Sequence, residues 1–294
     1  MTAQTWLITG ASGFIGRRIT ADLIRAGHRV CGLSRQDPKA LQDSGVEWIS
    51  KIEDCPFAPS HVLNLAGEPI ADKRWSESRK TLLRASRIGV TGILSDWLNQ
   101  QVTAPKVIIQ GSAVGYYGVS SLAKTEADSC GHGFSATLCR DWEKSLVPPM
   151  ASRVVYLRIG VVLGNGGGML SKLLPIFRLG LGGAVGDGQQ MLSWISLDDL
   201  IGLIHFAAEH ETLEGALNAS APNPMNYARF AKHLGAALHR PALLRTPAFV
   251  MRAAFGEMAE ELLLKGQTVL PKKALDHGFE FQHPWMCRAL SAAL

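Results

Sequence analysis

Three glycines near the N-terminus have the spacing of a phosphate-binding turn. Gly10, Gly13 and Gly16 come directly after the β-favouring run Thr5–Thr9 and directly before the amphipathic run Phe14–Ala26. Glycine permits the tight strand-to-helix turn and lets the backbone approach a pyrophosphate, while the helix N-terminus offers free N–H groups. Because strand, turn and helix follow in the required order, the pattern predicts a dinucleotide site. Its predicted residues are Gly10, Ser12, Gly13, Phe14, Ile15 and Gly16.

The residues after the second predicted strand, Arg29–Leu33, indicate which dinucleotide fits. An acidic side chain there binds the ribose hydroxyls of NAD, whereas a cation accommodates the 2′-phosphate of NADP. This chain has Ser34 and Arg35, and its first acid is Asp37. Ser34 can donate a hydrogen bond and Arg35 can make a charge-assisted bidentate contact. The pattern therefore favours NADP(H), and the alternative for Arg35 is an ordinary surface arginine.

Clusters of small residues follow three further predicted strands. They are Leu65, Ala66 and Gly67 after the fourth strand, Gly111 and Ser112 at the end of the fifth, and Arg158 and Gly160 around the end of the sixth. The carboxyl ends of parallel strands meet at one edge of a sheet, where open α/β sheets bind their ligands. We therefore expect all of these residues to line the cofactor site.

Hydride transfer to or from such a cofactor needs a proton donor or acceptor near the nicotinamide. The candidates at the mouth of the cleft are Ser112, Tyr116, Tyr117, Cys139 and Glu68. The two tyrosines could supply a phenol or could pack beneath the cofactor. Cys139 would need a lowered pKa to react, and its alternative is a buried helix cysteine. Glu68 could act as a base or cap the turn that follows it.

The elements that must position these residues alternate between strand and helix, which is typical of a Rossmann-type, doubly wound parallel sheet. The predicted strands are Thr5–Thr9, Arg29–Leu33, Val46–Ile49, His61–Leu65, Lys106–Gln110, Arg153–Arg158 and Met191–Ile195. The predicted helices are Phe14–Ala26, Ser76–Asn99, Phe134–Leu146, Leu170–Leu179, Leu200–Ala208 and Asn226–Leu238. Ser196 is suited to cap a helix that begins near Leu197.

The pattern of the sequence changes near residue 221, after which prolines separate short predicted helices. We expect an α/β Rossmann NADP-binding domain over residues 1–220, with a substrate-side insertion at 165–192 inside the glycine-rich stretch Gly164–Gly188. Residues 221–294 should form a smaller, mostly helical C-terminal domain that caps the cleft.

Composition argues against several classes of partner. The net charge of +5 is modest for 294 residues. The nearest approach to a basic patch is interrupted by Asp72 and Glu77 and consists of Lys73, Arg74, Arg79, Lys80, Arg84 and Arg87. The last three fall on one helical face, which could be solvated or could face a phosphate. We therefore predict no nucleic-acid partner. Nine histidines lack ligand spacing and no run of 18 residues is apolar, so we predict no metal and no membrane segment.

The cysteines and the position of the first strand indicate the cellular compartment. Five scattered cysteines, an odd number, predict a reducing compartment, and a strand that begins at residue 5 leaves no room for a signal peptide. We expect a cytoplasmic protein that is a monomer or homodimer and acts on a small molecule.

Taken together, the clusters resemble the extended short-chain dehydrogenase/reductase superfamily, the nucleoside-diphosphate-sugar epimerases and their relatives. Longer segments are similar to an atypical branch known as "epimerase family protein" or YfcH-like, with its own C-terminal domain. These segments are Asn64–Trp75, Ser112–Gly118, Gly182–Ile195 and Asn218–Pro222. The resemblance covers essentially the whole chain and implies a nicotinamide cofactor and a polar substrate such as a sugar nucleotide.

The resemblance breaks at the residues that carry the superfamily's chemistry. That chemistry uses a Ser or Thr, a Tyr, and a Lys four residues later, which lowers the pKa of the tyrosine and holds the nicotinamide ribose. The corresponding helix, Phe134–Glu143, contains neither Tyr nor Lys. In one register Ser135 and Cys139 stand at the Tyr and Lys positions, and in a register shifted by one turn Cys139 and Glu143 do. Ala113 stands at the Ser/Thr position.

Two classes of function remain. The first is an NADP(H)-dependent oxidoreductase or epimerase with an altered proton relay. The second is a catalytically silent NADP(H)-binding redox sensor or regulatory protein. The missing pair favours the second class, whereas the intact glycine turn and complete cap favour the first.

Overall fold

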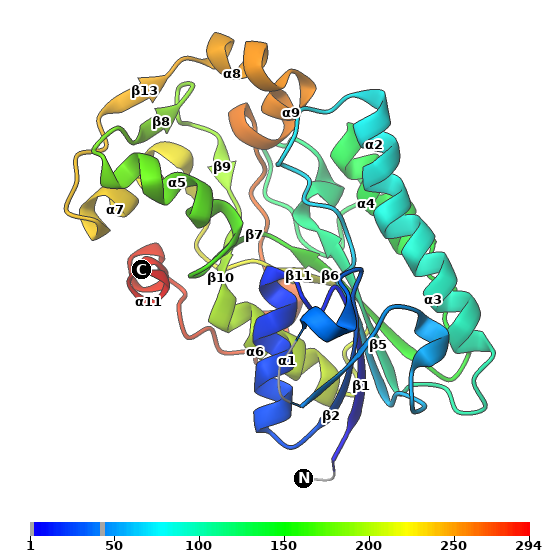
Figure 1. Cartoon of the computed structure of the whole chain (residues 1–294). Coiled ribbons are helices and arrows are strands. Elements are labelled where there is room, and N and C mark those ends of the chain that lie inside the picture. The colour runs from blue at the N-terminus through cyan, green and yellow to red at the C-terminus, as the bar shows by residue number, and fades with distance from the viewer. Residues whose placement is uncertain (1–2, 42–44) are drawn as a thin grey trace.

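The centre of the molecule is a parallel sheet of seven strands (Figure 1). The structure is a computed structural model that describes residues 3–41 and 45–294. The strands are β1 (Thr5–Thr9), β2 (Arg29–Leu33), β3 (Val46–Ile49), β4 (His61–Asn64), β5 (Val107–Ala113), β6 (Arg153–Ile159) and β11 (Gly215–Ala219). Their order, β3-β2-β1-β4-β5-β6-β11, is the doubly wound Rossmann order with one added strand. The predicted fold class is confirmed.

Helices cover both faces of this sheet. On one face α1 (Phe14–Arg25) and α6 (Leu197–Glu209) bury side chains such as Ile19 and Leu200 against Trp6 and Ile8 of β1. On the other face α3 (Val90–Asn99) packs Leu94 against Leu7. The flanking helices α2 (Glu77–Arg84) and α4 (Phe134–Lys144) lie on this second side. Successive residues of β1 thus face opposite layers, as buried parallel strands require.

One predicted strand does not belong to the sheet. The run Met191–Ile195 splits into β9 (Met191–Leu192), which pairs with β12 (Met225–Asn226), and β10 (Trp194–Ser196), which pairs with β7 (Val161–Leu163). The seventh strand of the sheet is instead β11, whose sequence Gly-Ala-Leu-Asn-Ala lacks the β-branched residues that mark a strand. The prediction was wrong because an apolar run indicates burial but not the pairing partner.

A predicted helix is also interrupted. The run Ser76–Asn99 forms α2 and α3 with a π-helical turn, Ala85–Gly89, between them. Helix α6 begins at Leu197 rather than Leu200, and the Asp199 N–H donates to Ser196 Oγ at 3.0 Å, so the predicted cap at Ser196 is confirmed.

The substrate-side region, as we call residues 161–196 and 221–294, lies for the most part beyond the carboxyl ends of the strands, at the upper left of Figure 1. Residues 272–276 instead pack beside β11, where Ala274 joins the core of the sheet. Besides β7, β9, β10 and β12, the region contains α5 (Gly168–Arg178), β8 (Gly183–Val185), α7 (Tyr227–Ala237), β13 (Leu244–Thr246), α8 (Ala248–Phe255), α9 (Glu257–Ala259), a π-helical turn (Glu260–Leu264), α10 (Lys272–Asp276) and α11 (Met286–Ala293). Its core combines Phe177 and Trp194 with Phe230 and Leu290, from both sides of residue 221. Every helix in the part of the chain that the structure describes is too short or too polar to span a lipid bilayer.

Candidate functional site

The glycine turn after β1 is held in close backbone contact. Gly10 has a φ of +69°, and a Cβ there would lie 2.7 Å from the carbonyl oxygen of Leu65. A Cβ on Gly16 would overlap the carbonyl oxygen of Gly10. Helix α1 begins after Gly13 with no side-chain cap and no acid in its first turn. Its first N–H groups are therefore free to receive an anion.

Buried polar side chains fix the neighbouring strand ends. Asn64 Nδ2 donates to Thr91 Oγ1 at 2.9 Å and to Gln110 Oε1 at 2.8 Å, and Thr9 Oγ1 donates to Asn64 Oδ1. The Ala66 N–H donates to Thr9 Oγ1 at 3.1 Å. This network ties the ends of β1, β4 and β5 together. Sequence reasoning missed it, although polar residues inside strands expected to be buried were a signal.

Hydroxyl groups and a cation gather at the end of β2. Ser12 Oγ lies 3.0 Å from Ser34 Oγ, and the Gln36 N–H donates to Ser34 Oγ at 3.1 Å. The Arg35 side chain is 83% exposed and its Nη1 lies 2.5 Å from Glu68 Oε1. The hydrogen bond from Arg35 holds the pKa of Glu68 below its usual range. Glu68 therefore forms an ion pair with Arg35, the residue that the sequence assigned to the 2′-phosphate of the cofactor.

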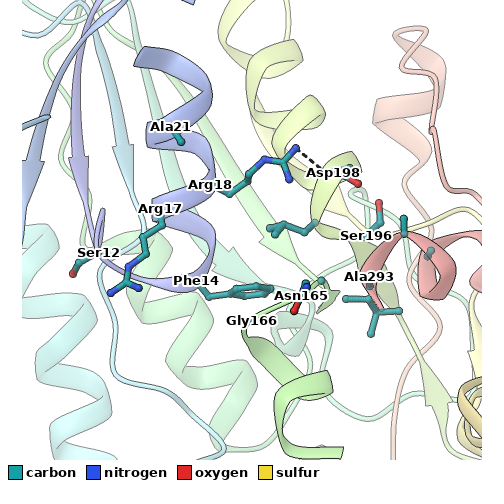
Figure 2. A pocket seen from close by; sticks show the side chains of 15 residues that line it. Ser12, Phe14, Arg17, Arg18, Ala21, Asn165, Gly166, Ser196, Asp198 and Ala293 are labelled. Carbon is teal, nitrogen blue, oxygen red and sulfur yellow. Dashed lines mark ion pairs between the residues drawn. The ribbon is translucent and has the colours of Figure 1, made fainter. Parts of the chain in front are cut away.

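A cavity of about 600 Å³ adjoins the first turns of α1 (Figure 2). Ser12, Phe14 and Arg17 line it from the turn and α1, and Asn165 lines it from the glycine-rich stretch. The Phe14 ring points toward Asn165 and Gly166 in Figure 2, and a Cβ on nearby Gly167 would overlap that ring. The same residue that opens the helix therefore anchors the start of the substrate-side region.

The carboxyl ends of β5 and β6 enclose a buried ion pair. Arg158 Nε and Nη2 each lie 2.9 Å from an oxygen of Glu143, and Ser112 Oγ donates to Glu143 Oε1 at 2.6 Å. Burial alone would lower the pKa of Arg158, but the hydrogen bonds and charge of Glu143 raise it. Two residues predicted for the cofactor site, Ser112 and Arg158, are therefore engaged beneath the strand ends.

The proton-transfer candidates differ in environment. Tyr117 is buried; its hydroxyl donates to Asn218 Oδ1 at 2.7 Å, and burial raises its pKa to about 12. Burial likewise raises the pKa of the Cys139 thiol to about 12. Tyr116 is only partly buried, and its ring centroid lies 3.4 Å from Arg158 Cζ. Neither Tyr117 nor Cys139 would ionise near neutral pH.

The N-terminus of α4 carries an unforeseen carboxylate. Glu261 accepts hydrogen bonds from the Phe134 N–H at 2.8 Å, the Ser135 N–H at 2.9 Å and Ser135 Oγ at 2.7 Å. A Cβ on Gly115 would lie 3.2 Å from Ser135 Cβ and 3.7 Å from Cys139 Sγ. Ser135 and Cys139 therefore face the turn that follows β5. No local pattern in the sequence connects residue 261 with residue 134.

The remaining predicted glycines also lie at close backbone approaches. A Cβ on Gly111 would lie 2.7 Å from the Asn64 carbonyl oxygen, and one on Gly160 would lie 2.8 Å from the Ser193 carbonyl oxygen. Among the described residues, no cluster of three His, Cys, Asp or Glu side chains could hold a metal ion.

Comparison with known proteins gives consistent results over the full length. Residues 6–219 match the model of the NAD dependent epimerase/dehydratase family, and residues 246–293 match a domain of unknown function, DUF1731. The chain is 41% identical to the epimerase family protein Mb2239 of Mycobacterium bovis, covering 97% of this chain and 96% of that protein. It is 38% identical to a chloroplastic SDR39U1 homolog of Arabidopsis thaliana, covering 99% and 87%.

Solved structures extend the comparison. The crystal structure of human SDR39U1 with NADPH matches with a TM-score of 0.90 and 33% identity, covering 98% of both chains. MoeE5 in complex with UDP-glucose and NAD shares the fold, with a TM-score of 0.78 at 19% identity over 98% of this chain and 97% of that one. The glycine turn, the strand-end clusters and these full-length matches together show that the chain belongs to the NAD-dependent epimerase/dehydratase family, among its SDR39U1-like members.

Proposed function

We propose that this chain binds NADP(H) across the carboxyl ends of β1, β2, β4, β5 and β6. The observation that carries the proposal is the group at the end of β2, where the Ser12 and Ser34 hydroxyls adjoin an exposed Arg35. A doubly charged 2′-phosphate needs such donors, and a ribose hydroxyl does not. The NADPH in the human SDR39U1 structure supports the same choice.

Each part of the dinucleotide has residues suited to hold it. The uncapped start of α1 offers N–H groups of Phe14 and Ile15 to the pyrophosphate, over a turn in which Gly10 and Gly16 leave no room for a Cβ. Leu65, Ala66 and Gly67 would line the cleft at the end of β4, between β1 and β5. At Gly111 and Gly160 the absence of a side chain lets neighbouring backbone pack closely around the cleft. When bound, the dinucleotide supplies or accepts hydride.

We further propose that the protein is an oxidoreductase or epimerase for a small polar substrate. Two contacts join the loop after β4 to the substrate-side region and support the proposal that the two segments together line a substrate site. Lys172 of α5 pairs with Asp72, and Arg74 donates to the Ala253 carbonyl oxygen at 3.3 Å. Sugar nucleotides, one of which MoeE5 binds, are the first class to test.

A silent NADP(H) sensor is the second candidate. It is favoured by the environments of Tyr117 and Cys139, whose raised pKa values make both groups weak acids that keep their protons near neutral pH. Ser135, at the Tyr position in one register, donates its hydrogen bond to Glu261 instead.

Two experiments test these proposals. Calorimetric titration of ligand-free protein should give tighter binding of NADPH than of NADH, and Arg35→Ala or Arg35→Asp should weaken NADPH about 10- to 100-fold, because a charge-assisted contact is lost, with little effect on NADH. Equal losses for both would refute the cofactor assignment. A screen of NADPH absorbance with sugar nucleotides, ketones and aldehydes then separates enzyme from sensor. Tight NADPH binding without turnover of any carbonyl would favour the sensor.

The cellular setting is also a proposal. All five cysteines are free thiols, which supports a reducing compartment such as the cytoplasm. A chloroplastic relative shows that members of the family occur elsewhere. We propose a monomer or homodimer, to be checked by light scattering at two protein concentrations.

A further inference from the structure

Arg87 occupies the π-helical turn Ala85–Gly89 that interrupts the expected helix. Such turns are rare and recur at functional sites. Arg87 Nη2 donates to the Glu68 carbonyl oxygen at 2.9 Å, and a Cβ on Gly67 would lie 3.0 Å from Arg87 Cζ. The guanidinium therefore lies directly against the loop after β4, at a glycine that the sequence assigned to the cofactor cleft.

This cation has no anionic partner among the described residues. Its neighbours on the same helical face do: Lys80 pairs with Glu257 at 2.7 Å, and Arg84 pairs with Asp141 at 2.8 Å. The hydrogen bonds of Arg87 go only to neutral oxygens, the carbonyls of Glu68 and Leu83 and the hydroxyl of Ser86. Burial lowers its pKa. A half-buried cation without a counter-charge costs free energy unless a ligand completes its contacts.

The position of Arg87 relates it to the residues missing from α4. Its Cζ lies 5.2 Å from the Trp142 ring, and Trp142 is three residues after Cys139 on α4. Cys139 stands where related enzymes carry the lysine that holds the nicotinamide ribose, in one of the two registers. The guanidinium thus lies beside the face of α4 that carries Cys139 and Trp142, although it comes from the turn between α2 and α3.

We propose that Arg87 replaces that lysine as a cofactor-binding residue and donates hydrogen bonds to the hydroxyls of the ribose next to the nicotinamide. This inference rests on the proposed binding of NADP(H). Its Nε has no partner among the described residues, so the guanidinium keeps a free donor for a ligand. Because arginine stays protonated, Arg87 would position the cofactor and would not transfer a proton.

The test compares two ligands. NADPH contains the nicotinamide ribose, whereas adenosine 2′,5′-bisphosphate carries the 2′-phosphate and adenosine but lacks that ribose. We expect Arg87→Met to raise the Kd for NADPH about 10- to 100-fold, as for the loss of a charged donor, and to change the Kd for the bisphosphate less than about twofold. Arg84→Met, which removes the neighbouring exposed cation, is the matched control and should change neither.

The outcomes separate a ligand contact from a structural role. If Arg87 only stabilises the loop after β4, Arg87→Met will weaken the binding of both ligands to the same extent, which would overturn the inference. An unchanged Kd for NADPH would overturn it as well. If Arg87→Met does not fold, as thermal unfolding without ligand would show, Arg87→Lys carries the test, with selective weakening of NADPH expected from loss of the planar fork. Wild-type protein that binds neither ligand would refute the proposed function itself, and this inference with it.

Discussion

The seven-stranded sheet and the substrate-side region are built in different ways. In the sheet, neighbouring strands pair over four to seven residues, as β5 does with β6 from Val107 to Ala113. In the substrate-side region each pairing spans only two or three residues, as between β8 and β13. Long strands have a local sequence signature, whereas strands this short are defined by their partner. In the substrate-side region, pairing with a distant segment determines which residues form strands. In the sheet, such pairing adds to a strand preference that the local sequence already has.

Segments of the substrate-side region are held together by hydrogen bonds between side chains and backbone groups that are far apart in the sequence. Ser193 Oγ donates to the Gln267 carbonyl oxygen at 2.8 Å and accepts from the Val269 N–H at 2.9 Å. Asp199 Oδ1 accepts from the Gln282 N–H at 2.6 Å, which joins α6 to the segment before α11. Individual side-chain contacts replace the continuous strand ladder here, so we expect this region to open more readily than the sheet.

We expect the largest effect of any single substitution at the glycine turn, which belongs to the sheet side of this comparison. Gly16→Ala places a methyl group on the carbonyl oxygen of Gly10, where only backbone movement makes room, so we expect loss of NADPH binding and a large fall in thermal stability. Gly92→Ala is the matched control, because a Cβ there meets nothing within 4 Å and lies inside α3, so it should stabilise by about 0.5–1 kcal/mol. Wild-type binding and stability in Gly16→Ala would contradict the assigned backbone packing.

The buried pair beneath the strand ends should give the next largest effect. Glu143→Gln leaves Arg158 buried without its counter-charge, and we expect the free energy of unfolding to fall by about 3–5 kcal/mol. Urea unfolding measures this change. The double variant Glu143→Leu/Arg158→Met removes both charges and should recover part of the loss. A double variant less stable than Glu143→Gln would show that the network contributes more than this charge balance.

A smaller change sharpens the contrast between the two regions. Asp199→Ala removes the acceptor for the Gln282 and His283 N–H groups, at a cost of about 1–3 kcal/mol. Hydrogen exchange should then accelerate in α11 while the amides of β1 keep their protection. Uniform acceleration across both regions would contradict the view that α11 opens independently of the sheet.

The smallest expected effect concerns the rim of the cofactor cleft. Glu68→Gln frees Arg35 from its carboxylate, so NADPH should bind up to about fivefold more tightly, because an exposed ion pair is worth at most about 1 kcal/mol. Affinity for NADH should stay the same. Weaker binding of NADPH in this variant would mean that Glu68 orients Arg35 rather than competing for it.

Sequence located the parts of the candidate site that are local, and their role toward the cofactor stays a prediction. The turn from Gly10 to Gly16 and the residues after β2 are each contained in one short segment, and their types follow from backbone geometry and charge. Arg87 was recognised only as one cation on a helical face, because the π-helical turn that contains it has no sequence pattern of its own. Glu261 and its partner Phe134 are 127 residues apart, so only the folded chain reveals their contact. The partners of Arg158 likewise come from separate elements.

The most direct measurement is calorimetric titration of the ligand-free protein with NADPH and with NADH. The account predicts one site per chain and at least about tenfold tighter binding of NADPH, from the charge-assisted contacts of the 2′-phosphate. No binding of either dinucleotide, or tighter binding of NADH, would contradict it.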